Sequence, residues 1–346
     1  MLKEIVNNTT MGIRGLHTCL VKTAPDCIKT VNWSEWSGKR LGIDIQCFLY
    51  RAIANHMSPL KVIANQIAHF KKFNIVPVYV FDGKAPIEKD TVMLKRRSDR
   101  QDANEMCESL RQSLLHETDP EIRESVSVKI RDLESRFPTL TYEIKDEVKK
   151  FLYATGTMFI CPSCEADTIL AYWFRRSVLD AIISFDLDFL PRQSRLLVPQ
   201  HISSLNSWSD YNPVDICSSL RMSQLQFVEF CALLGSDYTP DLPIVPWKSA
   251  LQSIQKKESL AAIWSRHTFN NWRQSNSNEK FQAELDMFTK AVLILNGELD
   301  DPACLMEGVQ WAKWHAGSQE PESLTLDEFH RKYDDWDSEW WALFAE

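Results

Sequence analysis

The sequence predicts an α/β fold in which a mostly parallel sheet is flanked by helices. Two observations support this prediction. Five short apolar runs alternate along the chain with amphipathic helical segments, and continuous apolar runs are typical of strands buried on both faces. Neighbouring parallel strands also need long crossover connections, which the helical segments can supply.

The predicted strands are short and rich in β-branched and aromatic residues. They are "RLGIDIQ" (40–46), "VPVYVFD" (76–82), "TMFICP" (157–162), "AIISFD" (181–186) and "RLLVP" (195–199). Amphipathic helices are expected at 59–74 and 165–178. From 84 to about 150 the sequence is charged and helical without a strand pattern, and an insertion of this size is usually functional. After residue 221 the pattern is helical.

Composition indicates a globular intracellular chain. The 346 residues are 44% hydrophobic, which is enough for a full core. No stretch approaches the roughly 20 apolar residues of a membrane span, and the N-terminus lacks the apolar run of a signal peptide. The nine scattered cysteines favour reduced thiols, so we expect no disulfide.

The negative charge is concentrated near the C-terminus. Residues 300–346 carry 12 acidic and 3 basic side chains, a net charge of −9, so subtracting it from the total of −8 leaves the first 299 residues at about +1. Within that part, the stretch "GKAPIEKDTVMLKRRSDR" forms a basic patch that includes Lys84, Lys89 and Arg100. The acidic total therefore does not argue against an anionic partner.

Carboxylates follow the predicted strands. Asp44, Asp82 and Asp186 each close an apolar run, and the carboxyl ends of parallel strands meet at the edge where open sheets bind ligands. Further acidic residues follow other apolar runs or begin a helix, where the helix dipole favours them. The sequence thus offers seven candidates for one acidic cluster: Asp44, Asp82, Glu165, Asp167, Asp186, Asp188 and Asp237. Buried carboxylates need a compensating cation.

Six sequence blocks resemble those of flap endonucleases and the wider XPG-type family of structure-specific 5′ nucleases. In chain order they are "MGIRGLHTCL", "GIDIQCFLY", "FDGKAPIEK" with "KRRSDR", "CEAD", "SFDLDFL" and "LLGSDY", and the resemblance covers roughly residues 11–255. It implies a PIN-like nuclease core at 11–220, which contains a helical arch at about 84–150. Residues 1–10 are an N-terminal extension to this pattern. Residues 221–346 are expected to form a helical C-terminal region with a degenerate helix-two-turn-helix element and an acidic tail, and from about 256 onward this region has no match to the family.

The resemblance implies that the seven carboxylates bind two Mg²⁺ ions, for which Mn²⁺ can substitute. Oxygen ligands suit such hard cations, and two of them can assist phosphodiester hydrolysis. Asp44, Asp82, Glu165 and Asp167 would lie closest to one ion and the other three carboxylates toward the second. Asp167 stands where the family usually has a glutamate, so this ligand is one methylene shorter.

Basic and aromatic residues are candidates for DNA contact. By resemblance, Lys89 and an arginine at the arch base stabilise the charge on the scissile phosphate, and the arginine is Arg96 by helical spacing or Arg97 by the run "RSDR". Tyr50 either stacks on a base or belongs to a helix core. The remaining DNA-contact candidates are Gly12, Lys84, Arg100 and Lys248.

Two regions depart from the family pattern. Ten residues precede Met11, so translation starts at Met1 or at Met11. Where the family has a Gly-x-Gly hairpin that approaches duplex DNA, this chain has Ile244 and Pro246; because proline lacks an N–H group, we expect weaker or different duplex anchoring. The acidic, Trp-rich C-terminus packs on the body, competes with DNA or binds a partner, and it contains no clamp-binding motif of the usual type.

The sequence therefore predicts a monomeric, metal-dependent endonuclease that cleaves 5′ flaps or related branched DNA in replication, repair or recombination. Three alternatives remain: a 5′ exonuclease, an RNA-preferring nuclease, or a catalytically inactive DNA-binding scaffold. No membrane partner is expected. The nucleus or sites of DNA replication are the expected location, with the cytoplasm as the alternative.

Overall fold

The predicted α/β fold with a mostly parallel sheet is confirmed. The computed structural model describes residues 12–239, 245–258, 263, 278–298 and 300. In this part of the chain, seven strands form one sheet in the order β1-β7-β6-β5-β2-β3-β4. The strands are β1 Ile28–Thr30, β2 Arg40–Asp44, β3 Val76–Val80, β4 Met158–Ile160, β5 Ala181–Ile183, β6 Leu196–Pro199 and β7 Trp208–Tyr211.

All five predicted strands are present, and β2 to β6 pair in parallel. Sequence reasoning missed β1 and β7, which pair with each other and extend the sheet antiparallel beyond β6. The β7 run "WSDY" places the polar residues Ser209 and Asp210 inside the strand instead of forming a continuous apolar run, and β1 has only three residues. Neither matches the pattern that identified the central strands.

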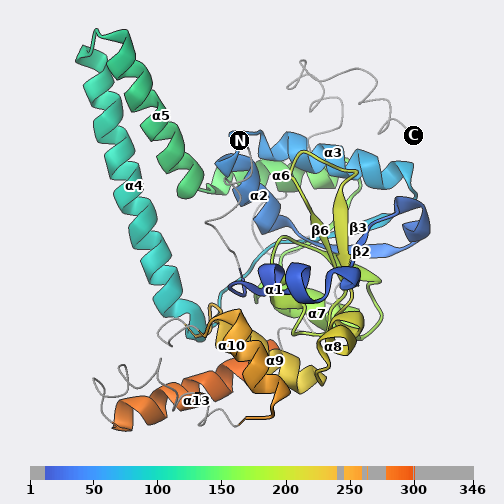
Figure 1. Ribbon diagram of the computed structural model, residues 1–346. Helices are drawn as coiled ribbons and strands as arrows, with labels where there is room; N and C mark the ends of the chain where they lie inside the picture. The colour runs from blue at the N-terminus through green and yellow to red at the C-terminus, as the bar shows by residue number, and fades with distance from the viewer. Residues whose placement is uncertain (1–11, 240–244, 259–262, 264–277, 299, 301–346) are drawn as a thin grey trace.

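Helices cover both faces of the sheet (Figure 1). They are α1 Leu16–Thr23, α2 Ile45–Ala54, α3 Pro59–Lys72, α4 Asp90–His116, α5 Pro120–Arg136, α6 Tyr142–Ala154, α7 Ala166–Arg175, α8 Pro213–Leu220, α9 Gln224–Leu234, α10 Trp247–Gln255 and α13 Asn278–Leu295. Single 3₁₀ turns occur at Pro25–Cys27, Trp33–Trp36, Ile87–Lys89 and Leu187–Phe189. None of the helices in these ranges has both the length and the apolar character needed to cross a membrane.

The alternation of side chains along the strands divides the core between the two faces. Val78 and Val80 of β3 pack with residues of α1, α7 and α9 on one face. Tyr79, between them, packs with α2, α3 and α6 on the other face. Such alternation is the two-residue period of a strand, and it explains why these runs are apolar at every position.

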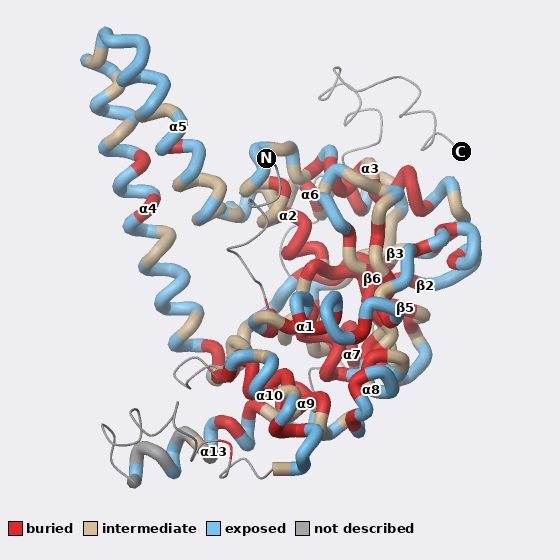
Figure 2. Tube along the Cα trace, in the orientation of Figure 1, coloured by how far each residue is buried: buried red, intermediate tan, exposed pale blue. Residues whose placement is uncertain are grey.

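The predicted insertion forms a projecting helical hairpin. Helices α4 and α5 pack against each other and extend away from the sheet (Figures 1 and 2), with mostly exposed side chains. Only Ala103 and Cys107 of α4, and Ile130 of α5, are buried. The third helix of the insertion, α6, packs on α3 and β4 and buries Phe151 and Leu152 in the core. The projecting part is therefore α4 and α5.

Cysteine pairing differs from the sequence expectation. Cys164 is disulfide-bonded, so the expectation of no disulfide is wrong at this position. The other seven cysteines in the described ranges are free. Scattered cysteine positions carry no information about which thiols the fold brings together, and this is why composition alone misjudged Cys164.

Candidate active site

Three predicted carboxylates lie at the carboxyl edge of the parallel strands. Asp44 is the last residue of β2, and Asp82 and Asp186 follow β3 and β5. Because these strands are parallel neighbours in the order β5-β2-β3, their ends bring the three side chains to one edge. Asp44 also caps α2 by accepting a hydrogen bond from the Cys47 N–H (3.4 Å), and it accepts another from the Ser184 hydroxyl (2.9 Å).

Asp82 links this edge to the start of α7. One of its carboxylate oxygens accepts a hydrogen bond from the Ala166 N–H (2.9 Å), and the other accepts one from the Gln46 side chain (2.7 Å). Glu165 is the residue before α7 and Asp167 lies in its first turn, where acidic residues are favoured by the helix dipole. The contact to Ala166 thus holds Glu165 and Asp167 beside the strand-end carboxylates.

Asp186 caps a single 3₁₀ turn at Leu187–Phe189, and Asp188 is the middle residue of this turn. The Asp186 carboxylate accepts a hydrogen bond from the Asp188 N–H (2.9 Å). Asp188 is 4% exposed, and its Oδ1 is buried without a hydrogen-bond partner among the described residues. Because a buried acceptor without a partner is costly, this atom indicates a position for a missing cation or water.

Gly12 packs directly against this pair. It has φ = +91°, and a Cβ at this position would lie 2.1 Å from Asp186 Oδ1 and 2.8 Å from Asp188 Oδ1. Only glycine fits, because any side chain would displace both carboxylates. Gly12 therefore lies at the carboxylate site.

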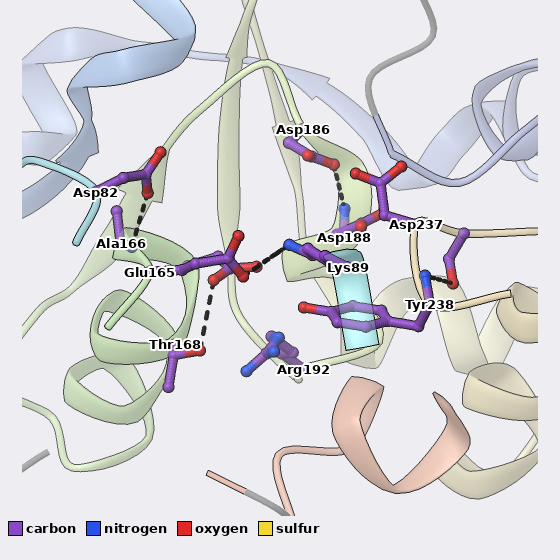
Figure 3. Close-up of polar contacts among 12 residues, drawn as sticks. Asp82, Lys89, Glu165, Ala166, Thr168, Asp186, Asp188, Arg192, Asp237 and Tyr238 are labelled. Carbon is purple, nitrogen blue, oxygen red and sulfur yellow. Dashed lines mark hydrogen bonds and ion pairs between the residues drawn. The ribbon is translucent and has the colours of Figure 1, made fainter. Parts of the chain in front are cut away.

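Lys89, at the base of α4, places its ammonium group among the carboxylates (Figure 3). Its Nζ donates to Glu165 Oε2 at 2.7 Å and lies 3.7 Å from Asp167 Oδ2. It also lies 4.7 Å from the centre of the Tyr238 ring, a cation–π distance. The lysine side chain is 10% exposed, so this ion pair is largely shielded from water.

The next turns of α4 distinguish the two candidate arginines. Arg96 Nη2 donates to Asp237 Oδ1 at 2.8 Å, which places its guanidinium at the site. Arg97 is exposed and makes no ion pair or hydrogen bond with the described residues. Of the two alternatives, the structure therefore places Arg96 beside the carboxylates.

The pKa values reflect the crowding of negative charge. Burial, followed by the neighbouring Asp82, raises the pKa of Asp44 to about 8. Burial, followed by Asp167, raises the pKa of Glu165 to about 7, and burial raises that of Asp186 to about 6. Burial also raises the pKa of Asp167, but Lys89 and Arg192 outweigh it and the net shift is downward.

Electrostatic repulsion connects all seven predicted carboxylates. Asp44 is affected by Asp82 and Asp186, Glu165 by Asp82 and Asp167, and Asp186 and Asp188 by Asp237. The fold therefore brings these carboxylates together in one site.

Lys89 holds one part of the carboxylate site together through its contacts with Glu165 and Asp167. Within the described ranges, no three His, Cys, Asp or Glu residues are spaced to hold one metal. The donor set nevertheless fits a hard divalent cation, because it is made of oxygens and includes the partnerless Asp188 Oδ1.

Among the described residues, the remaining sequence candidates form no hydrogen bond or ion pair with these carboxylates. Tyr50 is half-buried on α2, Lys84 and Lys248 are exposed, and Arg100 is half-buried on α4. Lys84 lines a cleft of about 450 Å³ that reaches Glu165 and Tyr238. Ile244, residues 1–11 and the acidic C-terminus fall outside the described residues, while Pro246 is the residue that precedes α10.

Sequence reasoning missed Arg192, which is 1% exposed. Its guanidinium donates to Asp300 (3.1 Å), lies near Tyr238 and Asp167, and reaches the same cleft. Nothing in the sequence distinguished Arg192 from a surface arginine, because its burial depends on Asp300, which is 108 residues farther along the chain.

Comparison with known proteins shows which proteins this chain resembles in sequence and in fold. The family model of the XPG N-terminal domain matches residues 11–103. The catalytic core of Rad2 in complex with a DNA substrate has a TM-score of 0.57 to this structure at 20% identity, covering 96% of this chain and 98% of that one. This likeness confirms the nuclease-type core fold.

Curated relatives agree with this class. Flap endonuclease 1 of Entamoeba dispar is 27% identical over 294 residues, which cover 78% of this chain and 75% of the relative. Flap endonuclease 1 of Tetrahymena thermophila is 25% identical over 323 residues, which cover 88% and 80%. Together with the domain match, these relatives confirm the resemblance to flap endonucleases and XPG-type nucleases.

Proposed function

We propose that this protein is a structure-specific DNA endonuclease that hydrolyses a phosphodiester bond in 5′ flaps or related branched DNA. The observation that carries the proposal is the convergence of seven carboxylates and two arch cations, Lys89 and Arg96, at one edge of the sheet. A catalytically inactive DNA-binding protein would not need to keep so many repelling carboxylates together, because their clustering is destabilising.

Two Mg²⁺ ions, replaceable by Mn²⁺, are the proposed cofactors. Asp44, Asp82, Glu165 and Asp167 would hold one of them, and Asp186, Asp188 and Asp237 would hold the other. When bound, such ions lower the pKa of water and neutralise the oxygens of the phosphate that is attacked. The shorter Asp167 side chain is compatible with this role, because its first-turn position on α7 keeps it close to Lys89 (3.7 Å).

The protein's own cations and helices would position the substrate. Lys89 and Arg96 present their positive groups where negative charge develops on the phosphate, and such groups, fixed in advance, commonly provide the largest part of catalysis. The burial of Lys89 strengthens its effect, since a shielded charge acts in a medium of low dielectric constant. Tyr50 on α2 would stack on a base without reading its identity.

The α4–α5 hairpin would supply structure selectivity. It begins directly after Lys89 and projects from the body of the protein (Figure 1), so it would stand beside a strand whose phosphate reaches Lys89. Threading a free 5′ end beneath it would select flaps by shape instead of by sequence. The process served would be DNA replication, repair or recombination, with the protein acting as a monomer inside the cell, in the nucleus or at replication sites.

The decisive experiment is cleavage of a 5′-labelled flap in the presence of Mg²⁺. We expect the intact chain to release the flap, and we expect Asp186→Asn to lose at least about 100-fold in rate, because it removes one charge from the proposed ligands. Nicked duplex and RNA flaps serve as comparison substrates. Equal cleavage by the two proteins would exclude the assignment, and faster cleavage of nicked duplex or RNA would favour the exonuclease or RNA-preferring alternative.

A further inference from the structure

Arg51 lies beside the carboxylate site but has no role in the machinery proposed above. It lies in α2, and its guanidinium carbon is 4.0 Å from the centre of the Phe185 ring. Phe185 is the residue directly before Asp186. Its Nε is buried without a hydrogen-bond partner, and it forms no ion pair with a carboxylate in the described ranges. Arg51 is nevertheless close enough to Asp186 to be attracted by it.

A second group of basic side chains lies on the other flank of the site, where Lys149 is hydrogen-bonded to the Cys161 side chain. The Nζ atom of Lys149 in α6 is 5.0 Å from the centre of the Phe81 ring. Phe81 is the residue directly before Asp82. Lys145, one turn earlier on α6, is attracted by Asp82 and repelled by Lys149. Neither lysine forms an ion pair with a described carboxylate. Burial lowers the pKa of Lys145, which shows that this lysine is partly withdrawn from water.

The two flanks share one construction. In each, a cation lies over the aromatic residue that immediately precedes a strand-end aspartate. An aromatic ring beneath a cation restricts its side chain and leaves its N–H groups available to an anion. Like charges one turn apart on a helix, such as Lys145 and Lys149, destabilise the helix unless an anion lies between them.

The flanks are also in line with the site. The sheet order β5-β2-β3 places Asp186 and Asp82 two strand spacings apart, which is about 10 Å along the edge. We propose that the reacting DNA strand lies along this edge, with its phosphates on the two sides of the cleaved bond held by Arg51 at one end and by Lys145 and Lys149 at the other. This inference rests on the proposed function and specifies the path of its substrate.

Charge supports this path. The edge between the flanks carries the carboxylates, which repel a polyanion, so the strand can be held there only if cations lie on both sides of the reacting phosphate. Arg51 and the two lysines are cations that described carboxylates have not already neutralised. Contacts of this kind carry no sequence information, as a structure-specific enzyme requires.

Salt-dependent binding tests the proposal. The affinity of the full chain for a fluorescent 5′-flap DNA is measured by anisotropy with Mg²⁺ between 50 and 200 mM KCl, in an Asp186→Asn background that prevents cleavage. Arg51→Met and the double variant Lys145→Met with Lys149→Met are compared with Lys150→Met. The last is a matched control, because Lys150 lies on the same helix but is paired with Asp146 (3.2 Å).

Each lost phosphate contact lowers the slope of log affinity against log salt by about 0.9. The Asp186→Asn parent should bind the DNA more tightly than the Arg51 and α6 variants. The ratio of the two affinities should fall by about 3.5-fold per lost contact when the salt concentration rises fourfold. Lys150→Met should retain the parent slope, and Arg51→Lys should regain it because the charge is restored. Circular dichroism and the melting temperature establish that each variant is folded.

An unchanged slope in either Arg51→Met or the α6 double variant would overturn the proposal, since both flanks are required. A change equal to that of Lys150→Met would do the same, because it would reflect total charge and not position. The outcome is separate from that of the proposed function: cleavage can depend on Asp186 while the flanks have no effect on binding, and DNA can bind along the flanks of a protein that does not cut it.

Discussion

Replacing Gly12 by alanine tests whether the Asp186 and Asp188 pair must keep its position. The new methyl carbon would lie 2.1 Å from Asp186 Oδ1, whereas ordinary contacts to a Cβ begin near 3.4 Å. Asp186 would have to move by more than about 1 Å, and a misplacement of this size commonly costs about 100-fold in rate. Its hydrogen bond to the Asp188 N–H (2.9 Å) would be lost with the movement.

The same substitution also introduces backbone strain, which must be separated from the steric effect. Gly38 has φ = +74°, and a Cβ added there would meet no atom within 4 Å, so Gly38→Ala carries the strain, about 1–2 kcal/mol, without the contact. In urea denaturation, we expect Gly12→Ala to lose at least as much unfolding free energy as Gly38→Ala. Flap cleavage should fall about 100-fold for Gly12→Ala alone. Normal cleavage by a folded Gly12→Ala protein would refute the reasoning.

Three further variants test individual contacts. Lys89→Met should lose about 3 kcal/mol or more of unfolding free energy in chelator, because it leaves the buried Glu165 unpaired, and Mg²⁺ should narrow the difference from the wild type in a denaturant titration. In single-turnover cleavage, Arg96→Met should be slower by about 100-fold or more, but Arg97→Met by less than about fivefold; equal rates would contradict the placement of Arg96. Burial, followed by Lys72, lowers the pKa of His69 to about 4, so folding disfavours its protonation. The difference in unfolding free energy between the wild type and His69→Gln should favour the wild type most above about pH 6.5, where His69 is neutral in both states. It should decrease toward pH 4, where only the unfolded chain gains the proton, and thermal melts at several pH values measure this change.

The sequence predicted the central sheet because local patterns determine it. The strands β3 and β5 are apolar at every position, and β2 buries the three residues between Arg40 and Asp44, as burial on both faces requires. β1 and β7 were not predictable in the same way, since they lie outside the parallel core and pair with each other across about 180 residues. Their assignment depends on tertiary pairing, which a local pattern does not contain.

The site was predictable to a similar extent. Asp44, Asp82 and Asp186 follow parallel strands, so topology alone brings them to one edge. Asp237 instead follows helix α9, so its place in the site depends on how that helix packs. The cations were less predictable: Lys89 was identified by resemblance, but Arg192 and Arg51 were not identified. Their positions depend on contacts such as Arg192 with Asp300 and Arg51 with Phe185, which join segments more than 100 residues apart.

The electrostatics of the site are better explained by function than by stability. A fold selected only for stability would not bury Asp188 with an unpaired oxygen or raise the pKa of Asp44 to about 8 beside another carboxylate. Both features cost folding free energy. The cations that partly compensate come from distant elements: Lys89 from the arch base and Arg192 from the segment after Asp188. A cluster of mutually repelling carboxylates at the ends of the parallel strands is expected where charge is needed for chemistry.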